Sequence, residues 1–224
     1  MPGLGTSLHT DMLRSGQKNR GLLERIKRAV HAFRENGGLY GLEWGDPECD
    51  PPLVYVKNHF LLEHLSTDAT VLEIGPGGGR WTRYLLAAKK VYAVDYHQEL
   101  LDELAKNFSR ANLVPLKNNG ADFPNVPLAS VDFAFSFGVF VHLDLDIVDS
   151  YLESLKTVMK PGASIVIQYP DQTKPLGRSN PTFAKNSPEQ MRDHVKAHGY
   201  EILEEDVKTL WHSSIVRFAL PASP

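Results

Sequence analysis

The sequence predicts an α/β protein built on a doubly wound sheet with mostly parallel strands. From residue 52 onward, short apolar stretches alternate with segments of helical periodicity, which is the pattern of repeated strand–helix units. The apolar stretches scarcely alternate with polar residues, as expected of parallel strands covered on both faces. The chain has 224 residues and is 42% hydrophobic, enough for one such domain with a sizeable core.

The part before this domain, residues 1–51, is expected to form an extension of different character. Residues 1–18 are small, polar and aperiodic, which predicts a flexible tail. Residues 19–38 predict a helix with one apolar face, ended by two glycines. Glutamates interrupt the basic residues on its other face, which favours a solvated surface over a nucleic-acid-binding helix. We therefore place a domain boundary between residues 51 and 52.

The elements of the main domain, residues 52–224, follow in order along the chain. Helices are predicted at 53–65, 80–90, 98–108, 146–160 and 187–199. Strands are predicted at 70–75, 91–95, 113–118, 131–137 and 164–169. The last helix should begin with Ser187 as N-cap and Pro188 at its first position. Residues 200–210 and 212–220 leave no room for a crossover helix, so they should form an antiparallel pair of strands.

A glycine-rich loop, in "VLEIGPGGGR" at residues 71–80, follows the first strand and should approach a ligand closely. It lacks the lysine and hydroxyl of a nucleotide-binding P-loop, and Arg80 stands where a dinucleotide-binding motif has its third glycine. Glu73, just ahead of the loop, would repel a phosphate by ~4 kcal/mol at 4 Å and an effective dielectric near 20. The loop therefore predicts a site for an uncharged or positively charged nucleoside.

Asp95 ends the second strand, where a carboxylate can accept both hydroxyls of a ribose. The simpler alternative is that Asp95 only caps the following helix. Its combination with the strand and the glycine loop favours the ribose role. Tyr96 follows directly and is placed to stack on a base.

At these residues the chain resembles a known family. "VLEIGPGGGRWT" and "VYAVDY" are similar to the first two motifs of class I S-adenosylmethionine-dependent methyltransferases. The similarity continues through "NNGADFP", "VDFAFSFGVFVHL" and "LKTVMKPGASIVIQYPD", over roughly residues 52–220. The resemblance implies a Rossmann-like seven-stranded sheet of order 3-2-1-4-5-7-6 with strand 7 antiparallel, an N-terminal helical cap, and S-adenosylmethionine as cofactor. This cofactor carries a sulfonium, an ammonium and no phosphate, which agrees with the position of Glu73.

The resemblance also assigns roles to individual residues. Glu73 lies near the methionine amine, and Asp95 binds the ribose. Phe137, at the end of the fourth strand, borders the methionine part. The residues expected to contact the cofactor are Glu73, Gly75, Gly77, Gly78, Asp95, Tyr96, Asn119, Gly120, Ala121, Asp122 and Phe137. Families of this kind often have a carboxylate where Asn119 stands, so Asp122 is the alternative side chain for the adenine edge.

The acceptor is predicted mainly by exclusion. The fourth strand ends in "SFGVFVHL", which is not the Asn/Asp-Pro-Pro-aromatic signature of amino-methylating enzymes that act on nucleic acids. No pair of glutamates follows it, as arginine methyltransferases have. The net charge of -3 and the pI of about 6.3 argue further against RNA as the acceptor. They also argue against an anionic membrane surface as a partner. A small hydroxylated metabolite, of sugar or natural-product type, is the leading class.

Methyl transfer to a hydroxyl needs a base, and the sequence predicts His142 for this role. The residue lies just past the fourth strand, and an unperturbed imidazole has a pKa near 6.5. In some O-methyltransferases that the chain resembles, a histidine at this position is the base. Asp171, after the fifth strand, is expected to orient His142 or to share its role. The alternative is that His142 only packs or caps the next helix.

Other interpretations remain at this point. His142, Asp144 and Asp146 have ligand types that suit a metal, but Asp144 or Asp146 is more simply a helix N-cap, so we predict no metal. A single cysteine and no membrane-length apolar run predict a cytoplasmic protein. The alternatives in function are a protein or RNA methyltransferase, a non-catalytic cofactor-binding module and an NAD oxidoreductase. The oligomeric state is left open.

Overall fold

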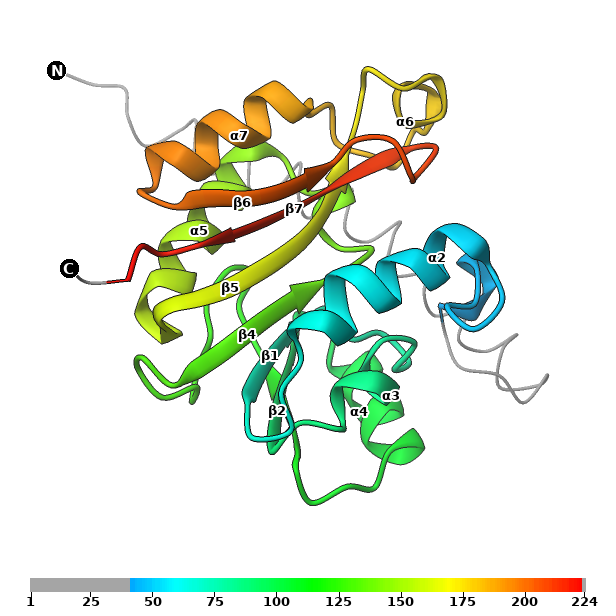
Figure 1. The fold of residues 1–224 in the computed structure, drawn as a ribbon. Helices are drawn as coiled ribbons and strands as arrows, with labels where there is room; N and C mark the ends of the chain where they lie inside the picture. The colour runs from blue at the N-terminus through cyan, green and yellow to red at the C-terminus, as the bar shows by residue number, and fades with distance from the viewer. Residues whose placement is uncertain (1–40, 223–224) are drawn as a thin grey trace, which may run out of the picture.

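A computed structural model describes residues 41–222 and contains the predicted seven-stranded sheet (Figure 1). The strands are β1 (Thr70–Ile74), β2 (Lys90–Asp95), β3 (Leu113–Lys117), β4 (Val131–Ser136), β5 (Met159–Pro170), β6 (Glu201–Asp206) and β7 (Ser213–Ala219). Their order is β3-β2-β1-β4-β5-β7-β6, and β7 is antiparallel to both of its neighbours. The carboxyl ends of β1 to β5 therefore share one edge of the sheet with the β6–β7 turn.

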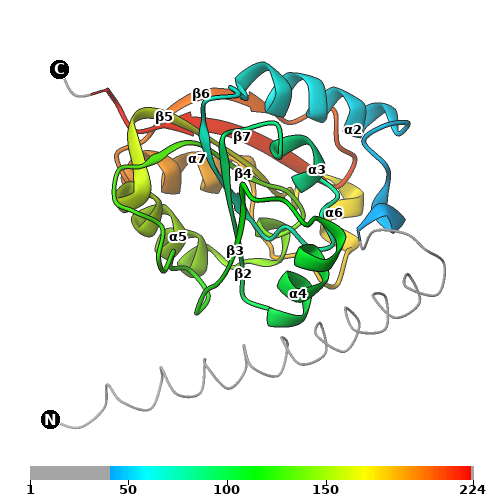
Figure 2. The same ribbon diagram turned by 90° about the horizontal axis from the view of Figure 1, so that it is seen from below.

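Helices cover both faces of this sheet, as the predicted parallel strands require. The helices are η1 (Leu42–Trp44), α2 (Pro51–Val56), η2 (Lys57–Leu61), η3 (Leu62–His64), α3 (Thr82–Leu85), α4 (Gln98–Asn107), η4 (Phe140–His142), α5 (Leu145–Val158), α6 (Pro175–Ser179) and α7 (Pro188–Ala197). Apolar residues of α2, η2 and α3 pack on one face of the sheet, and those of α5 and α7 pack on the other. Figure 2 shows α2 and α5 on opposite sides.

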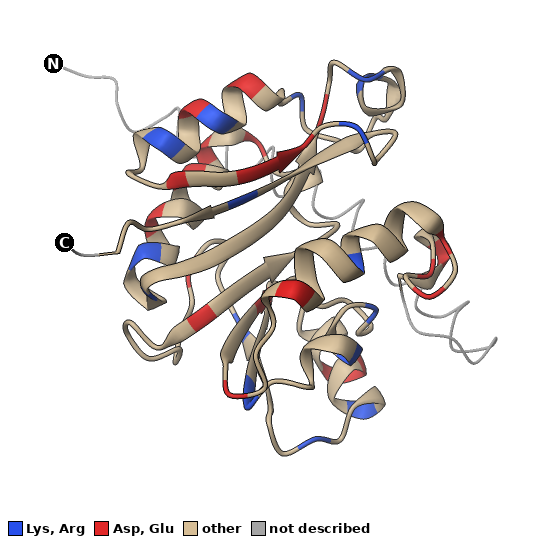
Figure 3. Cartoon of the chain, viewed as in Figure 1, with Lys and Arg blue, Asp and Glu red and all other residues tan. Residues whose placement is uncertain are grey.

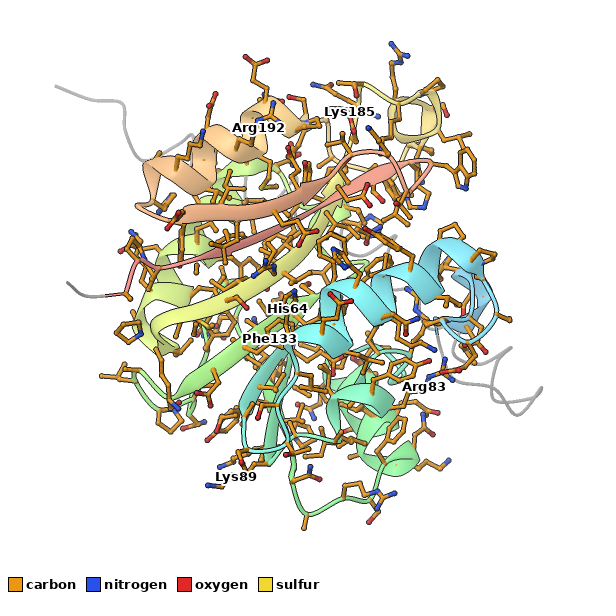
Figure 4. All side chains as sticks on the ribbon, viewed as in Figure 1. His64, Arg83, Lys89, Phe133, Lys185 and Arg192 are labelled. Atoms are coloured by element: carbon orange, nitrogen blue, oxygen red, sulfur yellow. The ribbon has the colours of Figure 1, made fainter. Side chains whose placement is uncertain are left out.

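The predicted helix at 53–65 is continuous but changes its winding. It begins as the α-helix α2, passes through the π-helical turn η2 and ends in the 3-10 turn η3. His64, in this last turn, lies beside Phe133 of β4, with ring centroids 6.5 Å apart (Figure 4).

The other helices and the strands differ from the predictions mainly at their ends. The predicted helix at 80–90 is reduced to α3, because i→i+3 bonds such as Ala87 N–H to Tyr84 O tighten the chain after Leu85. β5 begins at Met159 rather than at residue 164. The N-terminus of α7 is as predicted, with Ser187 and Gln190 in a reciprocal capping box.

The segment between β5 and α7 contains α6, a short helix that the sequence pattern did not predict. Gly177 in this helix packs directly on backbone. A Cβ added there would lie 2.2 Å from the carbonyl oxygen of Asp171 and 2.5 Å from that of His212. Only a glycine allows α6 to lie this close to both loops.

We therefore expect Gly177→Ala to lower the free energy of unfolding by about 3 kcal/mol, the upper end of the usual cost of overpacking. Denaturant titration would measure it. Gly199→Ala is the control: its φ of +78° is strained for alanine, but a Cβ meets nothing within 4 Å. The control should lose only about 1 kcal/mol. Equal losses in the two variants would contradict the close packing of α6.

The described part of the N-terminal extension, residues 41–50, is fixed against α3. Asp46 forms an ion pair with Arg83, which is labelled in Figure 4 beside the loop before α2. Glu48 accepts a hydrogen bond of 2.5 Å from the Tyr84 hydroxyl. The tail and helix predicted for residues 1–38 lie outside the described residues. Within the described residues, no helix has the length and hydropathy needed to span a membrane.

Candidate cofactor and acceptor site

The glycine loop lies between β1 and α3 at the carboxyl edge of the sheet. Gly75, Gly77 and Gly79 have φ angles of +72°, +56° and +102°, which side chains rarely adopt. A Cβ on Gly75 would lie 2.0 Å from a methyl carbon of Val139, so the loop also packs tightly on the segment after β4. Gly78 instead contributes its carbonyl oxygen, which accepts a hydrogen bond of 3.2 Å from Asn107. The conformation and the packing of this loop therefore require glycine.

Glu73 is buried at the end of β1, with 2% of its surface exposed. Its carboxylate accepts a 2.6 Å hydrogen bond from the Thr82 hydroxyl. Burial raises the pKa of Glu73 to about 8; the bond from Thr82 opposes this increase, and the charge of Asp95 adds to it. A buried carboxyl with so high a pKa favours a positively charged ligand beside it.

Asp95 is the second buried carboxyl of the site, with 8% of its surface exposed. Burial raises its pKa to about 6, against hydrogen bonds from the backbone N–H groups of His97, Tyr96 and Gly77. The bond from His97 measures 2.8 Å. The bond from Gly77 ties Asp95 to the glycine loop, so the two features that the sequence singled out lie together.

The region expected to read the adenine lies at the ends of β2 and β3. The Tyr96 ring is half exposed beside Asp95. Asn119 and Asp122 bond to each other: the Asn119 N–H and side-chain amide donate to the Asp122 carboxylate at 2.7 and 3.1 Å. They form one unit with Gly120, whose φ is +135°, and Ala121 between them. The two candidate side chains for the adenine edge therefore belong to the same turn.

Asn118 is a residue that the sequence reasoning missed. It is 2% exposed, and its side-chain nitrogen faces the Tyr151 hydroxyl at 3.3 Å. Its side-chain oxygen is buried without a hydrogen-bond partner in the described residues. Such an oxygen calls for a donor, and an adenine amino group is one. The position of Asn118 directly after a strand was a signal in the sequence. Asn119 is the same residue type at the next position, so the sequence did not distinguish the two.

Phe137 and Arg80 lie where the glycine loop meets the end of β4. The Phe137 ring is 4.7 Å from the Trp81 ring, and the Arg80 guanidinium lies over it at 5.5 Å. Arg80 is 6% exposed and donates to the carbonyl oxygens of Trp44 and Gly45, both at 3.2 Å. Arg80 therefore joins the described part of the extension to the predicted methionine end of the site.

His142 lies in η4, directly after β4. Its Nδ1 is 2.8 Å from the carbonyl oxygen of Thr182, and its ring meets the Phe183 ring edge-on at 5.5 Å. A carbonyl oxygen can only accept, so Nδ1 carries the proton and Nε2 is the basic nitrogen. Ala184 N–H also bonds to Val141 O at 2.9 Å, which fixes the same loop to η4.

Asp171 contacts Thr173, Ser214 and Lys174. Its oxygens accept from the backbone and hydroxyl of Thr173 and from the hydroxyl of Ser214, and Lys174 lies 3.7 Å away. Burial raises the pKa of Asp171, but these hydrogen bonds and the Lys174 charge outweigh it and lower the pKa. Asp171 is 1% exposed, and it stabilises the start of β7. The carbonyl oxygen of Thr182 orients His142.

Within residues 41–222, no group of three or more histidine, cysteine, aspartate or glutamate side chains could hold a metal ion. Asp144 is the N-cap residue of α5, although its side chain makes no capping hydrogen bond.

The site fits S-adenosylmethionine on three observations of its own. The loop between β1 and α3 depends on glycines with positive φ, the buried Glu73 carboxyl has a raised pKa that a cation would lower, and the buried Asn118 oxygen has no hydrogen-bond donor among the described residues. These observations agree with a cationic adenosine derivative.

This fit gives a prediction for Glu73→Gln. With a pKa of about 8, Glu73 is partly protonated at pH 7, and a bound cation favours the carboxylate. Binding of S-adenosylmethionine should therefore release protons, and its affinity should rise as pH rises toward 8. Both effects should disappear in Glu73→Gln, whereas a neutral adenosine analogue should bind alike to both proteins. Calorimetry in two buffers of different ionisation enthalpy measures the protons, and equal losses for the two ligands would make Glu73 purely structural.

Comparison with known proteins supports the same conclusion. Residues 71–162 match a family model described as a methyltransferase domain. No curated protein sequence matches the chain.

Solved structures share its fold at low sequence identity. A SAM-dependent methyltransferase from Aquifex aeolicus is 22% identical with a TM-score of 0.61, covering 76% of this chain and 94% of that one. One from Mesorhizobium loti is 11% identical with a TM-score of 0.63, covering 77% and 99%. The DhpI–SAH complex is 18% identical with a TM-score of 0.65, covering 90% and 96%. Residues 71–162 are therefore similar to a methyltransferase domain, and the order of the strands is that of the class I methyltransferase fold.

Proposed function

We propose that the protein transfers the methyl group to a hydroxyl oxygen of a small metabolite, of sugar or natural-product type, with His142 as general base. The observation that carries this proposal is the hydrogen bond from His142 Nδ1 to the Thr182 carbonyl oxygen at 2.8 Å. It leaves Nε2 as the basic nitrogen at the edge of the sheet that also holds the glycine loop. An alcohol needs a base of this kind for its proton.

The roles of the chain's own residues follow from their environments. Bound S-adenosylmethionine supplies a methyl carbon already activated by its sulfonium. Glu73 and Asp95 hold the cationic and ribose parts, and the glycine loop lets the backbone approach. His142 Nε2 accepts the hydroxyl proton, and Thr182 keeps the imidazole in place. The protein otherwise contributes positioning, because in-line transfer needs the acceptor oxygen about 3–3.5 Å from the methyl carbon.

The surroundings of His142 favour a small acceptor with some apolar surface. The rings of Phe183 and His212 meet edge-on at 5.3 Å, beside His142. Acidic and basic residues are interspersed in the view of Figure 3, and several acidic residues lie within β6 itself.

Two basic residues of the loop after β5 bond to backbone within the protein. Lys174 donates to the carbonyl oxygens of Leu210 and Ser213 at 2.8 and 2.6 Å, and Lys185 donates to that of Arg178 at 2.8 Å. These bonds help to fix the loop.

The test is the identity of the methylated atom. The protein should be incubated with methyl-labelled cofactor and separate panels of hydroxylated metabolites, amines, nucleic acids and proteins. The proposal expects an O-methylated small molecule, identified by mass spectrometry and by the carbon chemical shift of the new methyl group. Transfer only to nitrogen, nucleic acid or protein would refute the proposed acceptor class while leaving the methyltransferase assignment intact.

A further inference from the structure

Gln168, near the end of β5, connects two segments at the carboxyl edge of the sheet. Its side chain is 2% exposed. Its Oε1 accepts a hydrogen bond of 2.7 Å from the backbone N–H of Gly138, and its Nε2 donates one of 2.7 Å to the Ser213 hydroxyl. Because an N–H can only donate, the contact with Gly138 requires the oxygen of the amide on that side.

The segment held by Gln168 touches both halves of the proposed reaction. Gly138 has a φ of +85° and is exposed at the end of β4. The next residue, Val139, packs on Gly75 of the glycine loop so closely that a Cβ on that glycine would lie 2.0 Å from it. The Val139 carbonyl oxygen accepts from the backbone N–H of His142 at 3.0 Å. One short segment therefore sets the cofactor loop and the imidazole relative to each other.

The bond from the Ala184 N–H to the Val141 carbonyl oxygen holds the far end of this segment, and Gln168 holds its Gly138 end. The turn at Gly138 is followed by the single 3-10 turn η4, which orders only three residues. A buried amide that makes two bonds of 2.7 Å is a stiff support for such a segment.

We propose that Gln168 is a positioning residue for methyl transfer: through the Gly138 N–H it holds the segment 138–142 so that the cofactor and His142 Nε2 face the same acceptor oxygen. This inference rests on the proposed role of His142. Gln168 itself touches neither cofactor nor acceptor. It affects the rate of transfer only because it fixes the position of the segment 138–142.

The test compares two variants that break different ends of the same amide. Gln168→Met keeps the length of the side chain but removes both hydrogen bonds, whereas Ser213→Ala removes only the bond to the hydroxyl. We expect Gln168→Met to lower kcat by about 10–100-fold, since a displacement of about 1 Å can cost about 100-fold. Its affinity for S-adenosylhomocysteine should stay within about threefold, and Ser213→Ala should keep kcat within about threefold.

A second readout does not depend on the acceptor. The protein has 17 glycines, so 15N-glycine labelling gives a spectrum with few amide signals. The Gly138 amide should lose its protection from hydrogen exchange in Gln168→Met and keep it in Ser213→Ala. Unchanged Gly138 protection or a normal kcat in Gln168→Met would overturn the inference, as would an equal loss of kcat in Ser213→Ala. A loss of kcat in Gln168→Met together with none in His142→Ala would refute His142 as the base, and with it the positioning of His142 Nε2, and would leave only an effect of Gln168 on the glycine loop.

Gln168→Glu covers the case in which Gln168→Met does not fold. Its carboxylate still accepts from the Gly138 N–H, and the Ser213 hydroxyl can reverse to donate to it. This variant should keep the Gly138 amide protected from hydrogen exchange. Its kcat should fall by less than about 100-fold. A protected Gly138 with kcat lowered by about 100-fold or more in Gln168→Glu would overturn the inference.

Discussion

Replacing His142 by alanine should lower turnover by roughly 10²–10⁴-fold, the usual contribution of a general base. The affinity for S-adenosylmethionine should not change, because the residue lies on the acceptor side and bonds to Thr182 rather than to the glycine loop. Single-turnover transfer from labelled cofactor separates the chemical step from product release, and calorimetry measures binding.

His142→Gln separates the base from a merely structural imidazole. Its amide nitrogen can still donate to the Thr182 carbonyl oxygen, but it has no basic nitrogen. We expect it to be as slow as His142→Ala. If His142→Gln keeps near-normal turnover while His142→Ala does not, the imidazole only fixes the loop after β5, and positioning alone accounts for catalysis.

Replacing Asp95 by alanine should weaken cofactor binding more than tenfold, because hydrogen bonds to a charged group contribute ~1.5–3 kcal/mol. The pKa of about 6 gives a pH dependence: below this pH Asp95 is protonated, so wild-type affinity should fall as pH drops through 6. In Asp95→Ala this dependence should be lost. Isothermal titration between pH 5 and 8 measures both effects.

Two further variants keep this result interpretable. Asp95→Asn retains an oxygen that can accept from the His97 N–H, so it should fold and still bind weakly. Asp132→Ala is the control, because Asp132 lies at the start of β4, accepts from Thr70 N–H at 2.8 Å and pairs with Lys160 at 2.6 Å. Normal binding in a folded Asp95→Ala protein would contradict the location of the cofactor site.

Much of the fold is local enough to be predicted. The strands from 70 to 137 are runs of apolar residues whose pattern requires burial on both faces, and they appear within one or two residues of the expected bounds. Ser187, Pro188 and Gln190 define the start of α7 through contacts within one turn, and the capping box forms as that pattern predicts. Such features depend on neighbours in sequence.

The errors have a different cause. The pattern at 80–90 is helical, but the chain must turn into β2, and i→i+3 bonds end α3 early. α6 has only five residues and is fixed by the contact of Gly177 with two distant backbone oxygens. Neither event leaves a periodic signal, because each is decided by packing against another segment.

The sequence by itself determined the sheet, the glycine loop and the two carboxyls, because strand periodicity and residues directly after strands carry that information. It also placed His142 and Asp171 at the same edge of the sheet. Only the tertiary structure decided their partners: His142 bonds to Thr182, Asp171 bonds to Ser214, and Gln168 bonds to Gly138. These pairs are 40, 43 and 30 residues apart in the chain, so each contact exists only once the strands have paired and brought their loops to one edge.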